Sequence, residues 1–472
     1  MFYAVSRVAP HFRTYRSPTF STFSKASEST PLSRVLLSMF SCRSFLRISR
    51  CSPSYATRSL SLVSHDNSSV TVDLDDQKPI RVSFKTAFLR DSCNAPESVD
   101  VDTRQKSFTT AQVALNHKLA EDPTIVDTEN GNALQIKWKQ ADGSVHVSTY
   151  PEAFLKKHAS LPSRMKGKFF PERQVFWTNE EIVEDLHNLH VEYKDYFEGV
   201  DDFRKVVNGL NKYGIFFVDN MEDPLDNPQT HHITPHNELL WPVAKLAQRF
   251  GYIKKTFYGT LFDVKNEKKA KNIANTNVFL PLHMDLCYYE SPPGLQLLHF
   301  IKNSTLGGEN VFSDSFAAVK HIRQNDRVAY EALKKVPITY HYDNNGEYYY
   351  YLRPLIVEDP YIPDFTTGEA RIKEVNYSPP FQGNFEFGVT KDENPELFKD
   401  FMRGMVKFEE FINDPKNQYV VKMPENTCVI FDNRRVLHSR LQFSDSNGGD
   451  RWLMGCYVDG DSFRSKLRVL NR

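Results

Sequence analysis

The chain has 472 residues, a length typical of two domains or of one large domain with additions. Hydrophobic residues make up 40% and charged residues 25%, the composition of a globular protein. The 59 basic and 59 acidic residues cancel, so no excess of positive charge indicates a nucleic-acid partner. No apolar stretch approaches the roughly eighteen residues that span a bilayer, so we expect no membrane segment.

Residues 1–60 differ in composition from the rest of the chain. They hold nine basic residues and a single acid, Glu28, and they are rich in Ser and Thr. This pattern is typical of a mitochondrial transit peptide, with a disordered basic tail as the alternative. We therefore predict import into the mitochondrial matrix and cleavage between residues 45 and 62.

Six cysteines are present, and two of them lie in the predicted transit peptide. The other four are scattered and form no CxxC pair, which excludes a disulfide scaffold or a zinc ribbon. They are Cys93, Cys287, Cys428 and Cys456.

The first part of the body is rich in strand signals. Residues 67–90 alternate polar and apolar side chains, and residues 134–150 form two alternating runs joined at "ADGS", where Asp-Gly favours a hairpin turn. We predict a small N-terminal β-rich domain over residues 65–160. The basic, proline-bounded segment 162–177 is interpreted as a linker.

Helical and strand signals mix in the rest of the chain. Residues 201–218 have a helical period up to Gly214 and then a buried strand, and residues 237–251 form a helix that ends at Gly251. From residue 256 onward, short strands dominate. We therefore predict a mainly β fold with supporting helices, in which residues 175–472 form a β-sandwich or jelly-roll core.

The stretch "LPLHMDLCYYESPPGLQLLHF" (280–300) places His283 and Asp285 two residues apart in an apolar run. In a strand, such residues project to the same face. With one distant histidine they supply the two-histidine, one-carboxylate set that binds non-haem Fe(II). A second pair, His341 and Asp343, precedes an Asn-Asn-Gly turn, so we interpret it as structural.

The third ligand is expected near the end of the chain. In "ENTCVIFDNRRVLHSR" (425–440), a buried strand and a polar turn lead to His438. Arg451 then begins a strand in which Trp452, Met454 and Cys456 occupy the opposite face, so it could bind a carboxylate in a bidentate manner. The alternative is a surface histidine and an arginine paired with Asp450 or Asp432.

Several motifs in order carry a family resemblance. These are "LPLHMDLCYYESPPGLQLLHF", "GGENVFSDSF", "VIFDNRRVLHSR" and "RWLMGCYVD", with "FLRDSC" and "VHVSTYPEAFLKKH" in the first domain. From about residue 80 onward the chain resembles the γ-butyrobetaine/trimethyllysine dioxygenases, which are Fe(II)/2-oxoglutarate oxygenases. The resemblance implies a double-stranded β-helix core, O₂ and 2-oxoglutarate as cosubstrates, ascorbate as reductant, a role in carnitine biosynthesis, and a homodimer.

The same resemblance implies roles for individual residues. His283, Asp285 and His438 match the iron ligands, and Arg451 matches the residue that pairs with the 2-oxoglutarate carboxylate. Asn272 and Leu298 match further positions of the family's cosubstrate pocket.

Two departures from the family pattern affect these expectations. The family's N-terminal domain binds zinc through three cysteines and a histidine, but here only Cys93 and His146 remain, beside Ala95 and Ser98. Since structural zinc normally needs four ligands, we predict that this zinc site is lost.

The second departure concerns the aromatic cage that holds a trimethylammonium group by cation–π attraction. Tyr258, Phe262 and Tyr457 match cage positions, whereas Asn275 replaces a cage tyrosine. One of the tyrosines at 288–289 could compensate. Core packing is the alternative role for Phe262.

The sequence thus predicts a mitochondrial hydroxylase of γ-butyrobetaine or a related trimethylated amino acid. A dioxygenase with a different small substrate and a non-catalytic relative are the alternatives. The three iron ligands and Arg451 argue against the non-catalytic relative.

Overall fold

The computed structural model describes residues 60–74, 80–169, 173–265, 273–364 and 367–472. Apart from Leu60, the predicted transit peptide lies outside the described residues. Within the described ranges, no helix combines the length and apolarity that crossing a membrane requires.

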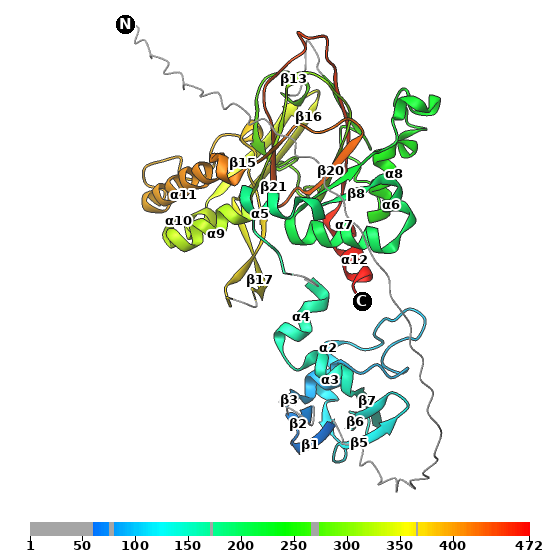
Figure 1. Ribbon diagram of the computed structural model, residues 1–472. Helices are drawn as coiled ribbons and strands as arrows, with labels where there is room; N and C mark the ends of the chain where they lie inside the picture. The colour runs from blue at the N-terminus through cyan, green and yellow to red at the C-terminus, as the bar shows by residue number, and fades with distance from the viewer. Residues whose placement is uncertain (1–59, 75–79, 170–172, 266–272, 365–366) are drawn as a thin grey trace, which may run out of the picture. The chain divides into compact units, whose positions relative to one another are not determined.

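The N-terminal part contains two small antiparallel sheets (Figure 1). The first, in the order β1-β2-β3, consists of Leu60–His65, Ser69–Leu74 and Ile80–Lys85. The second has the order β4-β6-β5, with β7 also on β6, and consists of Lys118–Leu119, Gly131–Lys139, Thr124–Thr128 and Val145–Pro151. Both sheets contribute to one apolar core that includes Val72, Leu134 and Trp138. The predicted hairpin at 134–150 is confirmed, because β6 and β7 pair in antiparallel register.

Four helices accompany these strands, namely α1 (Thr86–Asp91), α2 (Thr110–Leu115), α3 (Glu152–His158) and α4 (Leu161–Phe169). The segment interpreted as a linker, 162–177, therefore begins as helix α4. Its Arg, Met and Lys residues are good helix formers, a local signal that the flanking prolines obscured.

The rest of the chain is built on two larger sheets. The six-stranded sheet has the order β10-β23-β12-β20-β9-β8, which is Phe262–Lys265, Arg451–Val458, Leu295–Asn303, Thr427–Asp432, Ile215–Asp219 and His190–Glu192. All its pairs are antiparallel except β8 with β9. The four-stranded sheet has the order β11-β21-β14-β19, which is Leu280–His283, Val436–Arg440, Asn310–Asp314 and Tyr419–Val421.

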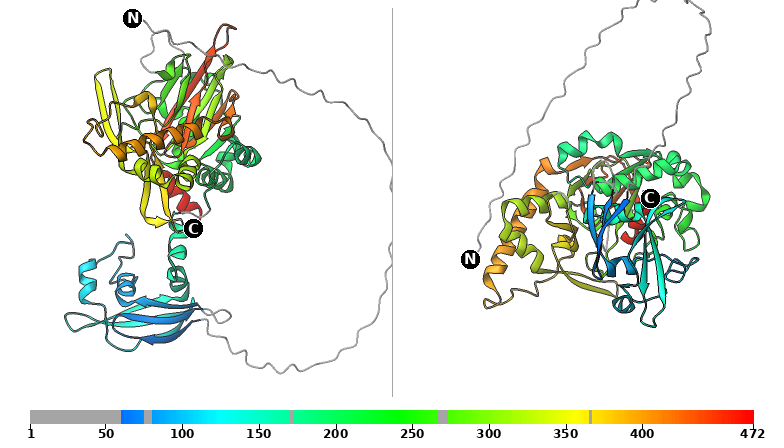
Figure 2. Two further views of the ribbon diagram at one scale, coloured as in Figure 1. Left: turned by 90° about the vertical axis from the view of Figure 1, so that its left-hand side faces the viewer. Right: turned by 90° about the horizontal axis from the view of Figure 1, so that it is seen from below.

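Helices cover both sides of these sheets (Figures 1 and 2). On one side, α6 (Tyr193–Glu198), α7 (Val200–Tyr213), α8 (Pro242–Phe250) and α12 (Gly460–Leu470) pack in one core with the six-stranded sheet. On the other side, α9 (Ser315–Asn325), α10 (Arg327–Lys335) and α11 (Pro395–Asn413) share a core with the four-stranded sheet. The short helix α5 (Asn179–Glu184) precedes them in the chain.

The predictions for this region are partly confirmed. Helix α7 ends at Gly214, which has a φ of +78°, and β9 follows it; α8 ends at Gly251. Short strands are the most frequent elements after residue 256, as predicted, but helices α9 to α11 were not predicted. Helices and strands contribute similar shares of the described residues, so the protein is mixed rather than mainly β.

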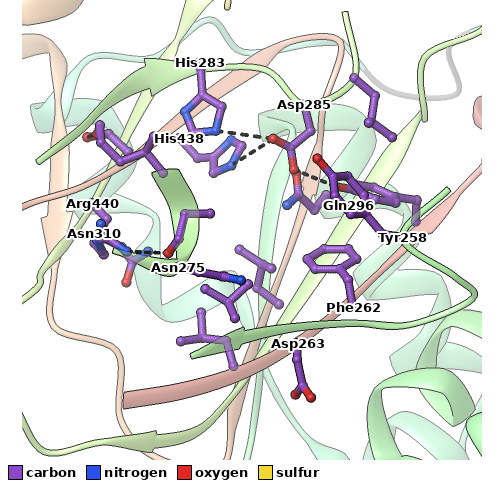
Figure 3. Close-up of a pocket in the computed structure, with 18 of the residues that line it drawn as sticks. Tyr258, Phe262, Asp263, Asn275, His283, Asp285, Gln296, Asn310, His438 and Arg440 are labelled. Carbon is purple, nitrogen blue, oxygen red and sulfur yellow. Dashed lines mark hydrogen bonds and ion pairs between the residues drawn. The ribbon is translucent and has the colours of Figure 1, made fainter. Parts of the chain in front are cut away.

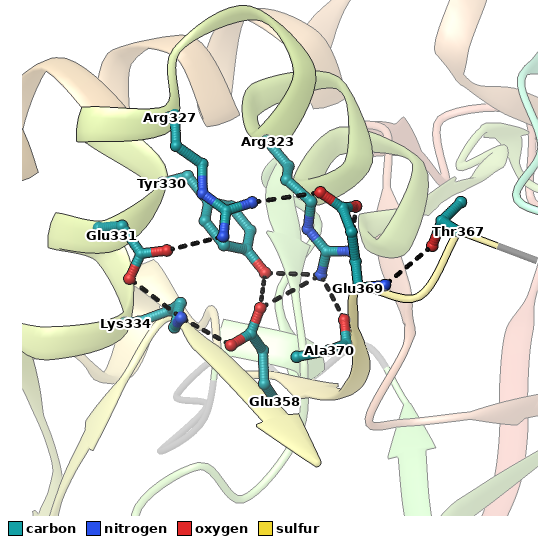
Figure 4. Close-up of polar contacts among 9 residues, drawn as sticks. All are labelled: Arg323, Arg327, Tyr330, Glu331, Lys334, Glu358, Thr367, Glu369 and Ala370. Atoms are coloured by element: carbon teal, nitrogen blue, oxygen red, sulfur yellow. Dashed lines mark hydrogen bonds and ion pairs between the residues drawn. The ribbon is translucent and has the colours of Figure 1, made fainter. Parts of the chain in front are cut away.

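Two hairpins extend from this body: β15 (Pro337–Asn344) with β16 (Glu347–Pro354), and β17 (Ile356–Pro363) with β18 (Ala370–Val375). A polar network joins α9 and α10 to the second hairpin (Figure 4). In it, Glu358 of β17 accepts hydrogen bonds from Tyr330 and Arg323 and lies 2.6 Å from the Lys334 ammonium. A short third pair joins β13 (Leu306–Gly307) and β22 (Phe443–Ser444).

A fully buried ion pair joins the turn before β21 to the end of β14. The Arg435 guanidinium donates to both carboxylate oxygens of Asp314, at 3.1 and 2.7 Å, and both side chains are 0% exposed. Its remaining donors reach the carbonyl oxygens of Lys212 and Val175.

Asp314 in turn begins helix α9, since its carboxylate accepts the Phe316 N–H at 3.0 Å. It also accepts the Trp177 N–H at 3.1 Å. The pair therefore links β14, α9, the turn between β20 and β21, and the segment that precedes α5.

Removing one partner of this pair should strongly destabilise the protein. The change Arg435→Met leaves Asp314 charged and buried, and we expect the free energy of unfolding to fall by about 3–5 kcal/mol. Urea denaturation followed by circular dichroism measures this loss. Lys399→Met, which removes an exposed pair with Glu396 on α11, is the matched control and should cause no measurable change. Equal stability of the two variants would contradict the stabilising role given to the buried pair.

Candidate metal centre

The three predicted ligands converge at one point between the two large sheets (Figure 3). His283 on β11 and His438 on β21 lie directly opposite each other in the antiparallel pair, with ring centroids 4.1 Å apart. The Nε2 atoms of His283 and His438 lie 3.3 and 4.0 Å from Oδ1 of Asp285. The candidate ligand atoms all lie within 4.8 Å of one another.

Asp285 reaches this point by a different route from the one expected. Strand β11 ends at His283, so the two residues do not alternate along one strand. Instead, the side chain of Asn433 holds Asp285 through its backbone: Oδ1 accepts the Asp285 N–H and Nδ2 donates to the Asp285 carbonyl, both at 2.9 Å. The geometry is therefore set by a long-range contact.

The protonation states of the three side chains suit metal binding. Burial and the neighbouring His283 ring lower the pKa of His438 to about 3, so its imidazole is neutral. Burial by itself raises the pKa of Asp285, but the neighbouring His283 and His438 rings and the Tyr457 hydroxyl outweigh it and hold that pKa well below its usual range. A neutral imidazole at His438 and an ionised carboxylate at Asp285 are forms that ligate a divalent cation.

The hydrogen bond of the first histidine provides an independent test of fit. The Nδ1 atom of His283 lies 2.8 Å from the Pro281 carbonyl, which can only accept a hydrogen bond. Nδ1 therefore carries a hydrogen, and Nε2 faces an Asp285 oxygen at 3.3 Å. A metal ion between these two atoms would be bound by both of them. The residues fit an iron ion of the facial-triad type.

A pocket opens beside this centre, and Arg451 lies in its wall. Arg451 is 5% exposed, and within the described part of the chain its Nε has no hydrogen-bond partner. Burial and the charge of Arg440 lower its pKa to about 9. Among the described residues no ion pair involves Arg451, so the alternative pairing with Asp450 or Asp432 is wrong. A buried guanidinium without an anion indicates a site for a carboxylate ligand.

Strand β23 has the alternation that its sequence predicts. Arg451, Leu453 and Tyr457 line the pocket, whereas Trp452, Met454 and Cys456 pack into the core on the other face of the sheet. Leu298 lines the pocket from the neighbouring strand β12. Asn272, the remaining predicted cosubstrate residue, lies outside the described residues.

All four residues assigned to the substrate side line the same pocket: Tyr258, Phe262, Asn275 and Tyr457. The Tyr457 hydroxyl donates to Oδ2 of Asp285 at 2.7 Å, and the Phe262 ring stacks on the Tyr457 ring with centroids 4.9 Å apart. The ring of Phe262 faces the pocket interior (Figure 3). Phe262 both packs against the core, as the alternative held, and lines the pocket.

Further lining residues were not assigned from the sequence, among them Gln296, Asn310, Phe381 and Arg440. Of the tyrosines at 288–289, Tyr288 lines the pocket, and its hydroxyl lies 3.4 Å from that of Tyr258. The i,i+2 spacing of Gln296 from Leu298 was a usable signal for a shared face. Nothing local in the sequence indicated Phe381.

The N-terminal residues of the former zinc pattern also lie together. The Cys93 sulfur and the Ser98 hydroxyl lie 3.2 and 3.3 Å from Nε2 of His146. Burial lowers the pKa of His146. The backbone N–H of Ala95 donates to the Cys93 sulfur at 3.4 Å. The loss of zinc remains a prediction.

Comparison with known proteins gives consistent matches. A family model described as taurine catabolism dioxygenase TauD, TfdA family matches residues 183–457. A dioxygenase of Strobilurus tenacellus is 33% identical over 400 residues, covering 83% of this chain and 86% of that one. A γ-butyrobetaine dioxygenase of Pseudomonas sp. is 29% identical over 399 residues (83% and 92%), and a mitochondrial trimethyllysine dioxygenase of Bos taurus is 26% identical over 388 residues (82% of each). The resemblance inferred from the motifs is confirmed.

The ligand assignment predicts a loss of metal on substitution. His283→Ala should weaken Fe(II) binding by about tenfold or more, because it removes a ligand from a set of three. Metal analysis of the loaded, desalted protein measures the iron retained per chain. His341→Ala, which changes the second His-x-Asp pair, is the control and should retain wild-type iron, because His341 is exposed on β15. Retention of iron by both variants would refute the assignment.

Proposed function

The chain belongs to the taurine catabolism dioxygenase TauD, TfdA family, and from this premise we propose that it is an Fe(II)- and 2-oxoglutarate-dependent hydroxylase. One observation supports this most strongly: a buried two-histidine, one-carboxylate cluster lies in the same pocket as a buried arginine that lacks an anion. A facial triad and a carboxylate-binding cation are what an enzyme needs to hold iron and a dicarboxylate together.

Each residue has a role in this proposal. His283, Asp285 and His438 would hold the iron, and Arg451 would bind the distal carboxylate of 2-oxoglutarate beside the apolar wall of Leu298. Bound Fe(II), with O₂ and with ascorbate as reductant, supplies the oxidative chemistry that couples 2-oxoglutarate decarboxylation to substrate hydroxylation. The protein contributes positioning and a dry pocket.

We propose that the substrate is γ-butyrobetaine or a related trimethylated amino acid. The substrate side of the pocket is largely aromatic, with Tyr258, Phe262, Tyr288, Phe381 and Tyr457 among its lining residues. Ring faces attract a quaternary ammonium group, and such an ion needs no hydrogen-bond partner. The similarity to a γ-butyrobetaine dioxygenase supports this choice.

A different small substrate is the second candidate. Three amides, Asn275, Gln296 and Asn310, also line the pocket, and among the described residues the Oε1 atom of Gln296 has no hydrogen-bond partner. A buried amide oxygen without a donor favours a substrate that carries an N–H or O–H group at that position. This observation favours a polar substrate over a fully methylated amine.

The finer organisation is also a proposal. The two antiparallel sheets on either side of the pocket would form the double-stranded β-helix of a catalytic domain spanning 175–472, with a separate β-rich domain at 65–160. The composition of residues 1–60 supports a transit peptide and a matrix location, and a mitochondrial relative agrees with this. The expected homodimer rests on the resemblance alone.

Changing the arginine should affect the cosubstrate specifically. Arg451→Met removes charge-assisted hydrogen bonds to a carboxylate, so we expect the apparent KM for 2-oxoglutarate to rise by about tenfold to a hundredfold. Arg451→Lys keeps the charge but loses the bidentate fork, and its KM should lie between those of the wild type and Arg451→Met. Steady-state succinate assays measure both values. An unchanged KM in Arg451→Met would contradict this role.

The function itself is tested by succinate formation. The iron-loaded protein lacking residues 1–60 is supplied with 2-oxoglutarate, ascorbate and O₂, together with γ-butyrobetaine, trimethyllysine or no amine. We expect succinate to form, with stimulation by one amine and matching hydroxylated product detected by mass spectrometry. Slow succinate formation that neither amine stimulates would refute the trimethylated substrate and favour the second candidate. Iron-loaded protein that forms no succinate at all would refute the dioxygenase proposal.

A further inference from the structure

The loop after Asp285 is held in an unfavourable backbone conformation. Leu286 is a buried, non-glycine residue with a φ of +59°, a region that bulky side chains rarely adopt. Such a conformation persists only when surrounding contacts enforce it. Two residues later, Tyr288 lines the pocket. The contacts that fix this loop therefore determine the position of one wall of the substrate pocket.

Two separate side chains fix the two ends of the loop. At the metal end, Asn433 binds the backbone of Asp285 and also donates to the Pro293 carbonyl at 3.4 Å. At the other end, Arg353 of β16 donates hydrogen bonds to three carbonyl groups. Its Nε donates to Cys287 O at 3.0 Å, and its Nη2 donates to Tyr289 O and to Glu290 O, the latter at 3.3 Å.

The surroundings of Arg353 suit a guanidinium that binds backbone carbonyl groups. Its residue exposure is 7%, and among the described residues no ion pair involves it. Burial and the neighbouring Arg434 charge lower its pKa. A buried guanidinium is costly unless its donors are satisfied, and here carbonyl oxygens satisfy it in place of a carboxylate. The loop and the arginine thus depend on each other.

The hairpin that carries Arg353 also supplies aromatic contacts to the loop. Tyr342 of β15 stacks on Tyr288 at 5.6 Å between ring centroids, and Tyr349 of β16 stacks on Tyr289 at 4.8 Å. Tyr342 and Tyr349 lie opposite each other in the hairpin register, and Tyr349 shares a face of β16 with Arg353. One face of the β15–β16 hairpin therefore supports the whole segment 287–290.

We propose that Arg353 is a positioning residue for the substrate: it holds the loop so that Tyr288 faces the pocket, while Asn433 independently holds the metal ligand Asp285. This inference rests on the proposed function only for the identity of the substrate. It divides the loop physically, with metal binding controlled from the β20–β21 turn and substrate binding controlled from the hairpin.

If metal binding and substrate binding are controlled from different ends of the loop, two variants should show different defects. Arg353→Met should speed hydrogen–deuterium exchange in the peptide that covers 286–290 by about tenfold, because three hydrogen bonds to a charged donor are lost. Its iron content per chain should equal that of the wild type. Asn433→Ala should lose iron. Tyr348→Ala, on the outer face of the same hairpin and 68% exposed, is the matched control and should change neither measurement.

Substrate kinetics then separate positioning from a general structural role. With γ-butyrobetaine as the probe, Arg353→Met should raise KM by about tenfold while kcat falls much less. Arg353→Lys restores the charge without the planar fork and should recover only part of the lost affinity. If γ-butyrobetaine fails with the wild type as well, the substrate proposal fails, but the exchange and iron measurements still decide this one. Equal iron loss in Arg353→Met and Asn433→Ala, or unchanged loop exchange, would overturn it.

Discussion

The turn from β20 to β21 is the constraint on which the rest of the structure depends. Three residues, 433–435, carry the chain from the six-stranded sheet to the four-stranded sheet. Asn433 ties this turn to the backbone of Asp285, and Arg434 donates to the Asn376 side chain at 2.6 Å. Arg435 forms the buried pair with Asp314. A single turn therefore fixes the spacing of the two sheets, and His438 follows it by three residues.

The buried arginines show how the protein separates support from chemistry. Arg435 is neutralised by Asp314, and Arg353 is satisfied by the carbonyls of Cys287, Tyr289 and Glu290. Each of them stabilises a backbone that would otherwise leave polar groups buried and unpaired. Arg451 is similarly buried, but among the residues that the structure describes it has neither an anion nor a hydrogen-bond partner for its Nε. Because burying an unsatisfied cation costs stability, a ligand that pairs with this arginine would account for its position.

The sequence predicted what depends on local pattern and failed where distant segments decide. The helix–Gly214–strand unit was readable because the signals lie within about twenty residues of one another. The strand that begins at Arg451 was readable from its alternation. By contrast, Asp285 reaches the metal centre through Asn433, a residue 148 positions away, and no local rule connects them. The hairpin residues that support the loop were missed for the same reason.

The pocket combines two recognition chemistries, and their positions limit what the substrate can be. Both arginines that line it, Arg440 and Arg451, lie within each other's electrostatic reach, where Arg440 lowers the pKa of Arg451. Among the other lining residues rings dominate, with Asn275, Gln296 and Asn310 as the amides. A substrate carboxylate would therefore receive hydrogen bonds from amides rather than a salt bridge. Amides bind an anion more weakly than a guanidinium does, so the rings must supply most of the binding free energy and thereby set the specificity.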